Sequence, residues 1–216
     1  YYKVLPGQGD YYDPMLYSRD EGELRNVRFD SRLTRKIRVK KYEGHSSDVI
    51  TDITLDWLKN KREEDKPFFL MHHFKAPHDM FNYAKRYDDY LENVDFPMPK
   101  TGYEPEWGSV ATRGYNDSLI HYIGSSLGKR NGIRNMGKDL GISQSLPAEK
   151  YKEKAYQEYM KRYFRCLKGI DDNVKRLFNY LEQEDMIDNT IIIYTSDQGM
   201  FLGEHDFIDK RWIYEE

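Results

Sequence analysis

The sequence contains almost no cysteine, since Cys166 is the only one among 216 residues. A single cysteine excludes an internal disulfide and any zinc site that is built from several thiolates. Long apolar runs are missing too, and about 20 consecutive apolar residues are needed to cross a bilayer. The sequence therefore predicts no membrane-spanning helix, and the residues after Tyr1 show no apolar signal-peptide segment.

Neither sign of charge is in large excess, because 34 basic and 37 acidic residues give a net charge of −3. Proteins that bind nucleic acids in general carry a strongly basic surface, so we expect no nucleic-acid partner. Aromatic residues are abundant instead, at 15% of the chain with 19 tyrosines. Such side chains fill a core or stack on sugars, and composition alone leaves both uses open.

Two stretches of the chain show the periodicity of amphipathic helices. Apolar residues recur at intervals of three and four over about 47–62 and again within about 148–184. The polar residues 46–48 supply the chemistry that caps the first of these helices. Between the helices, 79–150 is rich in Pro, Gly and Tyr, so we expect an irregular region with one short helix near 116–123. An irregular stretch of this length is typical of a functional loop.

Shorter apolar runs predict β-strands. Residues 66–74 and 190–195 are each expected to form a buried strand. A hairpin is expected around Val27–Val39, within an otherwise loop-rich stretch that ends near His45. A strand, a long connection that contains a helix, and a second strand form the βαβ pattern of a mostly parallel sheet. The sequence therefore predicts an α/β fold.

Polar side chains follow both of the predicted core strands. Lys75 and His78 come after the first strand, and a cluster from Asp197 to Lys210 comes after the second. In open α/β sheets, ligands bind outside the carboxyl ends of the strands. We therefore expect the two clusters to face one crevice.

Each of these side chains has a functional and a structural interpretation. Asp197 and Gln198 offer adjacent oxygen atoms of the kind that calcium and magnesium bind, although a tight turn at the strand end explains them equally well. His78 can protonate a leaving group or bind an oxyanion near neutral pH, but many histidines are structural. Lys75 and Lys210 are candidate partners of a tetrahedral anion, or ordinary surface lysines.

Four segments, in the same order as in the family, resemble motifs of the sulfatases of the alkaline-phosphatase-like superfamily. They are VLPGQGDYYDP at Val4–Pro14, PFFLMHHFKAPH at Pro67–His78, CLKGIDDNV at Cys166–Val174 and SDQGMFLGEHDFIDKR at Ser196–Arg211. The first of them is similar to a subgroup of bacterial sulfatases. The resemblance implies a partial alkaline-phosphatase-like sandwich, in which a mostly parallel sheet is flanked by helices.

The resemblance also implies hydrolysis of sulfate esters and a set of residues that would perform it. Asp197 and Gln198 correspond to two ligands of a calcium ion that binds the sulfate oxygens. His78 corresponds to a proton donor to the leaving alcohol, and Lys210 corresponds to a lysine that binds a sulfate oxygen. Calcium, a lysine and a protonated histidine all stabilise the negative charge that develops as a sulfate ester is cleaved.

Two further residues correspond to substrate-binding positions of a subgroup. Lys75 and His205 are found together in sulfatases that act on glucosamine 6-sulfate and other glycan sulfates. The resemblance therefore implies a sulfated carbohydrate as the substrate and a role in glycan degradation. It also implies a periplasmic or extracellular location for the whole protein, whereas the oligomeric state is not readable from the sequence.

The nucleophile of the family has no counterpart in this sequence. Sulfatases use a formylglycine made from the Cys or Ser of a Cys/Ser-x-Pro/Ala-x-Arg motif. Cys166 is followed by Leu-Lys-Gly-Ile, so we expect a small buried thiol on a helix instead. Ser31 has the right spacing to Arg35, but Leu33 stands where the motif has Pro or Ala.

The paired aspartates that complete the calcium site of the family are missing too. We therefore expect 1–216 to be an incomplete catalytic domain, without the N-terminal nucleophile and metal portion and without the C-terminal subdomain. Within it, 79–150 is expected to be the irregular loop region on the substrate side. By itself, the chain is expected to have no sulfatase turnover.

Two alternatives to a sulfatase remain open from the sequence. The first is a phosphodiesterase or phosphonate hydrolase of the same superfamily, since those enzymes use similar metal ligands at strand ends. The second is a non-catalytic glycan-binding protein, which would use the aromatic residues of the loop at about 85–150.

Overall fold

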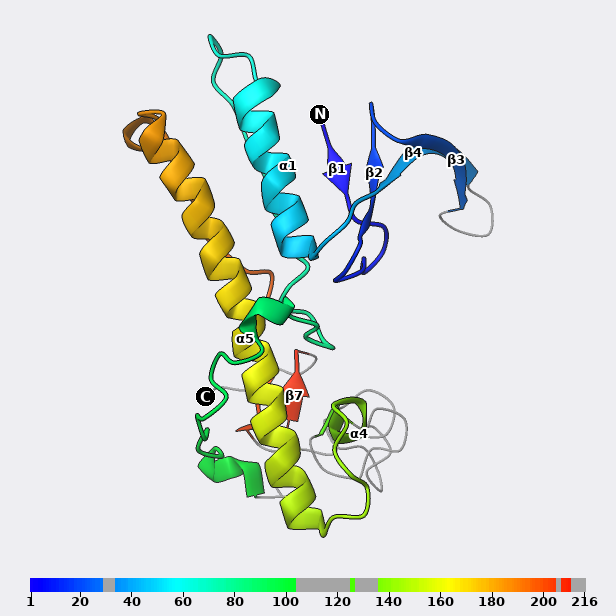
Figure 1. Cartoon of the computed structure of the whole chain (residues 1–216), viewed down its shortest axis with the longest axis vertical. Helices are drawn as coiled ribbons and strands as arrows, with labels where there is room; N and C mark the ends of the chain where they lie inside the picture. Colours follow the sequence, from blue (N-terminus) through cyan, green and yellow to red (C-terminus); the bar gives the residue numbers. More distant parts are fainter. Residues whose placement is uncertain (29–33, 104–124, 127–135, 205–206, 211–216) are drawn as a thin grey trace. The chain divides into compact units, whose positions relative to one another are not determined.

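Figure 1 shows a computed structural model of the chain, which describes residues 1–28, 34–103, 125–126, 136–204 and 207–210. The chain divides into two units. The first consists of Tyr1–Asp88 with Arg165–Thr190, and the second consists of Asp89–Phe164 with Ile191–Glu216. One long helix contributes to both units. In the ranges given above, no helix has the length and apolarity that crossing a bilayer requires.

The N-terminal part of the first unit is an antiparallel sheet of four strands in the order β1-β2-β4-β3. Its strands are β1 (Lys3–Val4), β2 (Met15–Ser18), β3 (Glu23–Arg28) and β4 (Thr34–Lys41). The hairpin predicted around Val27–Val39 is confirmed, because β3 and β4 pair along their length, with Arg25 opposite Ile37. Leu16 of β2 and Val39 of β4 are buried, whereas most residues of β3 face solvent.

The first predicted helix is confirmed as α1, which spans Ser46–Asn60, but a different residue caps it. Nδ1 of His45 accepts the hydrogen bond from the Ser47 backbone N–H at 3.3 Å. The hydroxyl oxygens of Ser46 and Ser47 are buried and have no partner among the described residues. His45 takes this role because its Nε2 lies 2.9 Å from the carbonyl oxygen of Asn82, which accepts its proton and leaves Nδ1 as an acceptor.

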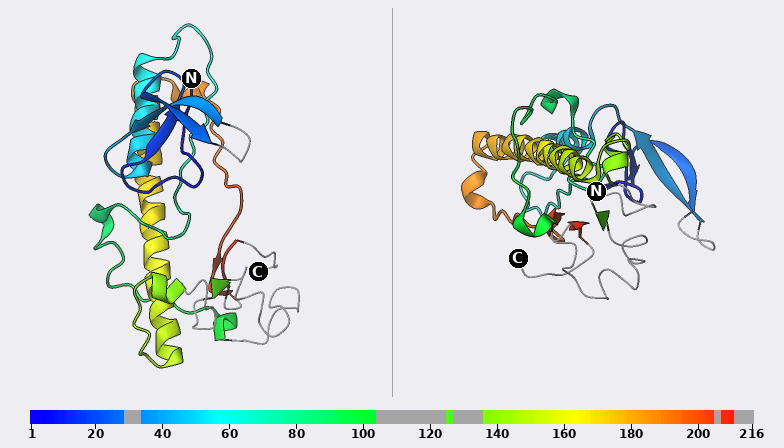
Figure 2. Two further views of the ribbon diagram at one scale, coloured as in Figure 1. Left: turned by 90° about the vertical axis from the view of Figure 1, so that its right-hand side faces the viewer. Right: turned by 90° about the horizontal axis from the view of Figure 1, so that it is seen from below.

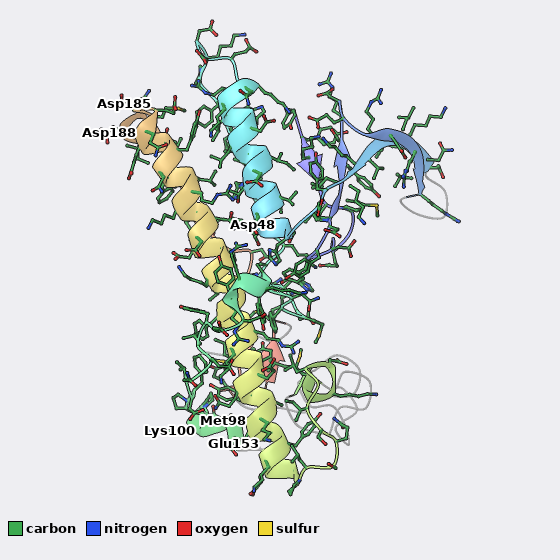
Figure 3. All side chains as sticks on the ribbon, in the orientation of Figure 1. Asp48, Met98, Lys100, Glu153, Asp185 and Asp188 are labelled. Atoms are coloured by element: carbon green, nitrogen blue, oxygen red, sulfur yellow. The ribbon has the colours of Figure 1, made fainter. Side chains whose placement is uncertain are left out.

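The second predicted helix is confirmed as α5, which spans Ala148–Gln183. In the first unit, its C-terminal part packs along α1 (Figure 1), and Leu58 forms a buried cluster with Tyr180 and Leu181. Figure 3 shows Asp48 in the first turn of α1, where its carboxylate accepts a hydrogen bond from Asn173 of α5 at 2.9 Å. An apolar cluster and a buried polar contact therefore join the two helices.

In the second unit, the N-terminal part of α5 supports the segment around residue 96. The ring of Phe96 stacks on Phe164 with centroids 5.3 Å apart. The hydroxyl of Tyr156 donates to the carbonyl of Pro97 at 3.0 Å. These contacts hold part of an otherwise irregular region against the helix.

The described residues between 79 and the beginning of α5 at Ala148 form only short elements. These are η1 (Lys85–Tyr87), η2 (Lys100–Tyr103), β5 (Ser125–Ser126) and α4 (Met136–Asp139). The short helix predicted near 116–123 lies outside the described residues. After α5 follow η4 (Ile187–Asn189), β6 (Phe201–Leu202) and β7 (Phe207–Asp209), and the second sheet has the antiparallel order β5-β7-β6.

The α/β class is confirmed, but the prediction that 66–74 and 190–195 form β-strands was wrong. Residues 67–75 and 190–195 are extended without strand pairing, and Figure 2 shows 191–199 as an extended segment without an arrow. Phe69 is 86% exposed and Ile193 is 82% exposed. A strand is buried only when neighbouring strands bond to it and a layer covers its face. Among the described residues no strand pairs with either segment, so the parallel ladder is absent and both described sheets are antiparallel.

Candidate active site

Lys75 and His78 lie at the two ends of a tight turn in the first unit. The His78 backbone N–H donates to the Lys75 carbonyl at 3.1 Å, and the Phe81 N–H donates to the His78 carbonyl at 3.2 Å. The Phe81 side chain is completely buried, which anchors the far end of the loop. The turn thus brings together two of the residues that the sequence predicts for the site.

The imidazole of His78 is held by its neighbour Asp79. Nδ1 of His78 lies 2.7 Å from the carbonyl oxygen of Asp79 and 2.7 Å from its Oδ1. Both oxygen atoms are acceptors, so Nδ1 carries the proton in this arrangement. The side chain of His78 is 31% exposed. Nε2 is therefore the ring nitrogen that can give a proton to a ligand or accept one.

The ammonium of Lys75 is held by the segment Gln8–Tyr11. Its Nζ donates to the Gln8 carbonyl at 2.8 Å and lies 4.8 Å from the centroid of the Tyr11 ring. A cation over an aromatic face is attracted by the ring quadrupole. These contacts fix the position of a positive charge three residues before His78.

Asp197 and Gln198 lie in the second unit, on an exposed turn. The hydroxyl of Ser196 donates to the Gln198 carbonyl at 2.6 Å and accepts from the Gln198 backbone N–H at 3.3 Å. The side-chain amide of Gln198 donates to Asp197 Oδ2 at 3.3 Å. The turn is therefore closed by Ser196, and it presents the two predicted ligands side by side.

The donor chemistry of this turn fits part of a site for a hard cation. A carboxylate and an amide oxygen are ligands that calcium accepts, but calcium takes six to eight oxygen atoms in all. The described part of the chain contains no group of three or more His, Cys, Asp or Glu side chains that could hold a metal ion. Asp197 and Gln198 would therefore supply only a share of the ligands.

Lys210 returns to the same region of the second unit through the β6–β7 hairpin. Phe201 pairs with Asp209 in this hairpin, and Lys210 follows Asp209 directly. The antiparallel register therefore brings Lys210 back to the beginning of β6, shortly after Gln198. His205, the sixth predicted site residue, lies outside the described residues.

Cys166 does not have the surroundings of a nucleophile. It is 2% exposed on α5, and burial raises the pKa of its thiol to about 12. A thiol reacts through its thiolate, which is scarce at neutral pH with such a pKa. The buried helical thiol expected from the sequence is confirmed, whereas Ser31 lies outside the described residues.

Two residues that contact the predicted site were not found by the sequence reasoning. Asp79 follows His78 directly, and its position next to the Pro-His dipeptide was the available signal. Tyr11 lies in the segment Val4–Pro14, and its hydroxyl donates to the His78 carbonyl at 2.5 Å. Nothing local in the sequence connects Tyr11 with a residue 67 positions away.

Comparisons with known proteins identify relatives of this chain. A family model described as Sulfatase matches residues 6–214. The N-acetylglucosamine-6-O-sulfatase of Bacteroides thetaiotaomicron is 33% identical over 250 residues, covering 100% of this chain and 42% of the relative. The N-acetylglucosamine-6-sulfatase of Bos taurus is 27% identical over 175 residues, covering 78% of this chain and 25% of the relative.

A solved structure is similar to this chain. It is a protein in complex with its substrate D-glucosamine-2-N,6-O-disulfate, with a TM-score of 0.72 and 31% sequence identity. The match covers 99% of this chain and 47% of that protein. This chain thus spans less than half the length of the relatives described here.

Proposed function

Since the chain belongs to the sulfatase family, we propose that the whole protein hydrolyses sulfate esters of carbohydrates, with 6-sulfated amino sugars as the substrate class. One observation carries the proposal: the 33% identity to an N-acetylglucosamine-6-O-sulfatase extends over the entire chain. The structure solved with a disulfated glucosamine supports the same substrate class.

In this proposal His78 acts as the proton donor to the leaving sugar alcohol. Its Nδ1 is engaged by Asp79, so Nε2 would carry the proton that is transferred. Lys210 would bind a sulfate oxygen, and Lys75 and His205 would contact the sulfated sugar. Fixed positive groups of this kind stabilise the charge that develops on oxygen during ester cleavage.

We further propose that Asp197 and Gln198 bind calcium, because their oxygen atoms match the ligand preference of that ion. When bound, calcium would offset the negative charge of the sulfate oxygens. Cys166 does not suit the formylglycine nucleophile that the family resemblance implies, since it is buried on α5 and Leu-Lys-Gly-Ile follows it in place of the family motif. The nucleophilic step is therefore assigned to no residue of this chain.

A periplasmic or extracellular location is proposed for the whole protein.

The test is the release of sulfate from N-acetylglucosamine 6-sulfate by the full-length protein. Replacing His78 by Ala should lower kcat by about 10²–10⁴-fold, the usual contribution of a general acid. His73→Ala is the matched control, because His73 is exposed and precedes the turn, and it should leave kcat unchanged. Chelation of calcium should abolish turnover, and added calcium should restore it.

Two outcomes would replace this proposal by another one. Turnover of phosphate diesters in the absence of sulfatase activity would favour a phosphodiesterase of the same superfamily. Binding of sulfated sugars that survives both Asp197→Ala and His78→Ala, without turnover, would favour a glycan-binding protein.

A further inference from the structure

Tyr11 lies behind the turn that carries Lys75 and His78. It belongs to the segment Val4–Pro14, which the proposed function does not use. The side chain is only 5% exposed, although it ends in a hydroxyl group. A buried phenol of this kind normally has a hydrogen-bond partner, and the identity of that partner indicates what the residue does.

The partner of the Tyr11 hydroxyl is the main chain of the turn. The hydroxyl donates to the His78 carbonyl at 2.5 Å, and that carbonyl also accepts the Phe81 N–H at 3.2 Å. Burial raises the pKa of the Tyr11 phenol well above its usual range, so the group keeps its proton and remains a donor near neutral pH. The two bonds fix the orientation of the peptide group between His78 and Asp79.

The ring of Tyr11 has contacts of its own, which are separate from those of the hydroxyl. One contact is the Lys75 ammonium, 4.8 Å from the ring centroid. The hydroxyl has a further neighbour on α5, because Sγ of Cys166 lies 4.0 Å from its oxygen. Tyr11 therefore connects helix α5 with both ends of the turn, and a substitution by Phe would separate the role of the hydroxyl from that of the ring.

The 78–79 peptide group joins His78 to the residue whose oxygen atoms contact its Nδ1. The carbonyl oxygen and Oδ1 of Asp79 each lie 2.7 Å from Nδ1, and both belong to the residue that directly follows this peptide group. We propose that Tyr11 is a positioning residue for His78. Its hydroxyl holds the 78–79 peptide group so that Asp79 keeps a proton on Nδ1 and Nε2 is the nitrogen offered to the substrate. This inference rests on the proposed role of His78 in sulfate ester cleavage.

The test is ¹⁵N NMR of the histidine ring nitrogens in the full-length protein, which reports the tautomer without any turnover. Spectra are recorded about two pH units above the ordinary histidine pKa of about 6.5, where neutral rings predominate. The signals of His78 are assigned by their loss in His78→Gln. In the wild-type chain we expect Nδ1 to be protonated and Nε2 to be unprotonated. In Tyr11→Phe both signals should move toward the average of the two tautomers.

Tyr156→Phe is the matched control. Tyr156 is 3% exposed, and its hydroxyl also donates to a backbone carbonyl, that of Pro97. This variant loses an equivalent bond elsewhere and should leave the His78 signals unchanged. If Tyr11 only fills space, Tyr11→Phe will also leave them unchanged, and the proposal is overturned.

A second measurement covers the case in which Tyr11→Phe does not fold. The Tyr11 hydroxyl proton of the wild-type chain should show a coupling through the hydrogen bond to the ¹³C carbonyl of His78. Absence of this coupling, or a wild-type His78 protonated on Nε2, overturns the inference. Because none of these signals depends on catalysis, they would remain as expected even if the protein proved not to be a sulfatase.

Discussion

At the scale of single residues, burial rather than residue type decides which titratable side chains carry charge. His72 and His73 are neighbours in the sequence, yet only His73 is exposed. The Nε2 of His72 is buried without a partner among the described residues, and Nδ1 lies 2.8 Å from the Thr54 hydroxyl. Burial, with a smaller contribution from His73, lowers the pKa of His72 to about 4.

This lowered pKa predicts a loss of stability in mild acid. Below about pH 6.5 the unfolded chain binds a proton at His72 that the folded chain does not bind, so the free energy of unfolding falls as the pH decreases from 6.5 to 4. The loss should reach about 2–3 kcal/mol at pH 4. His72→Gln should remove this part of the pH dependence in chemical denaturation experiments.

His73→Gln serves as the control for this prediction, because the side chain is exposed and adjacent in sequence. Its stability curve between pH 6.5 and pH 4 should stay close to that of the wild type, because His73 makes only the smaller contribution to the pKa of His72. An equal flattening of the curve in both variants would show that burial of His72 is not the cause.

At the scale of elements, the turn before β3 depends on one glycine. Gly22 has φ +99°, and the Ser18 hydroxyl accepts the backbone N–H groups of Asp20 and Glu21 at 3.2 and 3.1 Å in the same turn. A Cβ at Gly22 would lie 2.3 Å from the Val39 carbonyl oxygen of β4. The turn and the close approach of β4 therefore both require glycine.

Gly22→Ala should lower the free energy of unfolding by more than about 2 kcal/mol, because the positive φ and the clash with the β4 backbone each destabilise the folded chain. Gly7→Ala is the matched control, since Gly7 has φ +53° and no atom within 4 Å of the added Cβ. It should cost about 1 kcal/mol, from the backbone conformation alone. Equal losses of unfolding free energy in urea would contradict the clash at β4.

At the scale of the whole molecule, each unit exposes an extended apolar segment. The first unit exposes Phe69 and Met71, at 86% and 64%, and the second exposes Ile191 and Ile193, at 92% and 82%. Monomeric soluble proteins rarely leave so many large apolar side chains together in water. Unpaired extended backbone at such a segment also offers hydrogen bonds to other chains.

We therefore expect the 216-residue chain to bind a hydrophobic dye and to self-associate. Phe69→Lys combined with Ile193→Lys should reduce dye fluorescence by roughly twofold and shift sedimentation toward the monomer. Gln183→Lys combined with Asn189→Lys is the control, because it adds the same two charges at exposed positions without removing a large apolar side chain. If it had the same effect, net charge rather than the apolar segments would cause the association.

The sequence by itself determined the features that depend on short-range patterns. The two helices follow from apolar residues three and four positions apart, and the hairpin follows from neighbouring segments whose pairing needs only a short connection. The four ordered motifs were sufficient for the family. They also identified Lys75, His78, Asp197, Gln198 and Lys210 as candidates, since residue type and order are properties of the chain alone.

Only the tertiary structure decided what depends on residues distant in sequence. Tyr11 and His78 are 67 positions apart, so no local pattern in the sequence predicts their hydrogen bond. His45 caps α1 because its other ring nitrogen is bonded to the distant residue Asn82. The apolar runs 67–74 and 191–194 have the composition of buried strands, but burial requires neighbouring strands that composition does not supply. Local periodicity specifies an element, whereas its partners, its burial and the protonation of its side chains arise from contacts that form when the chain folds.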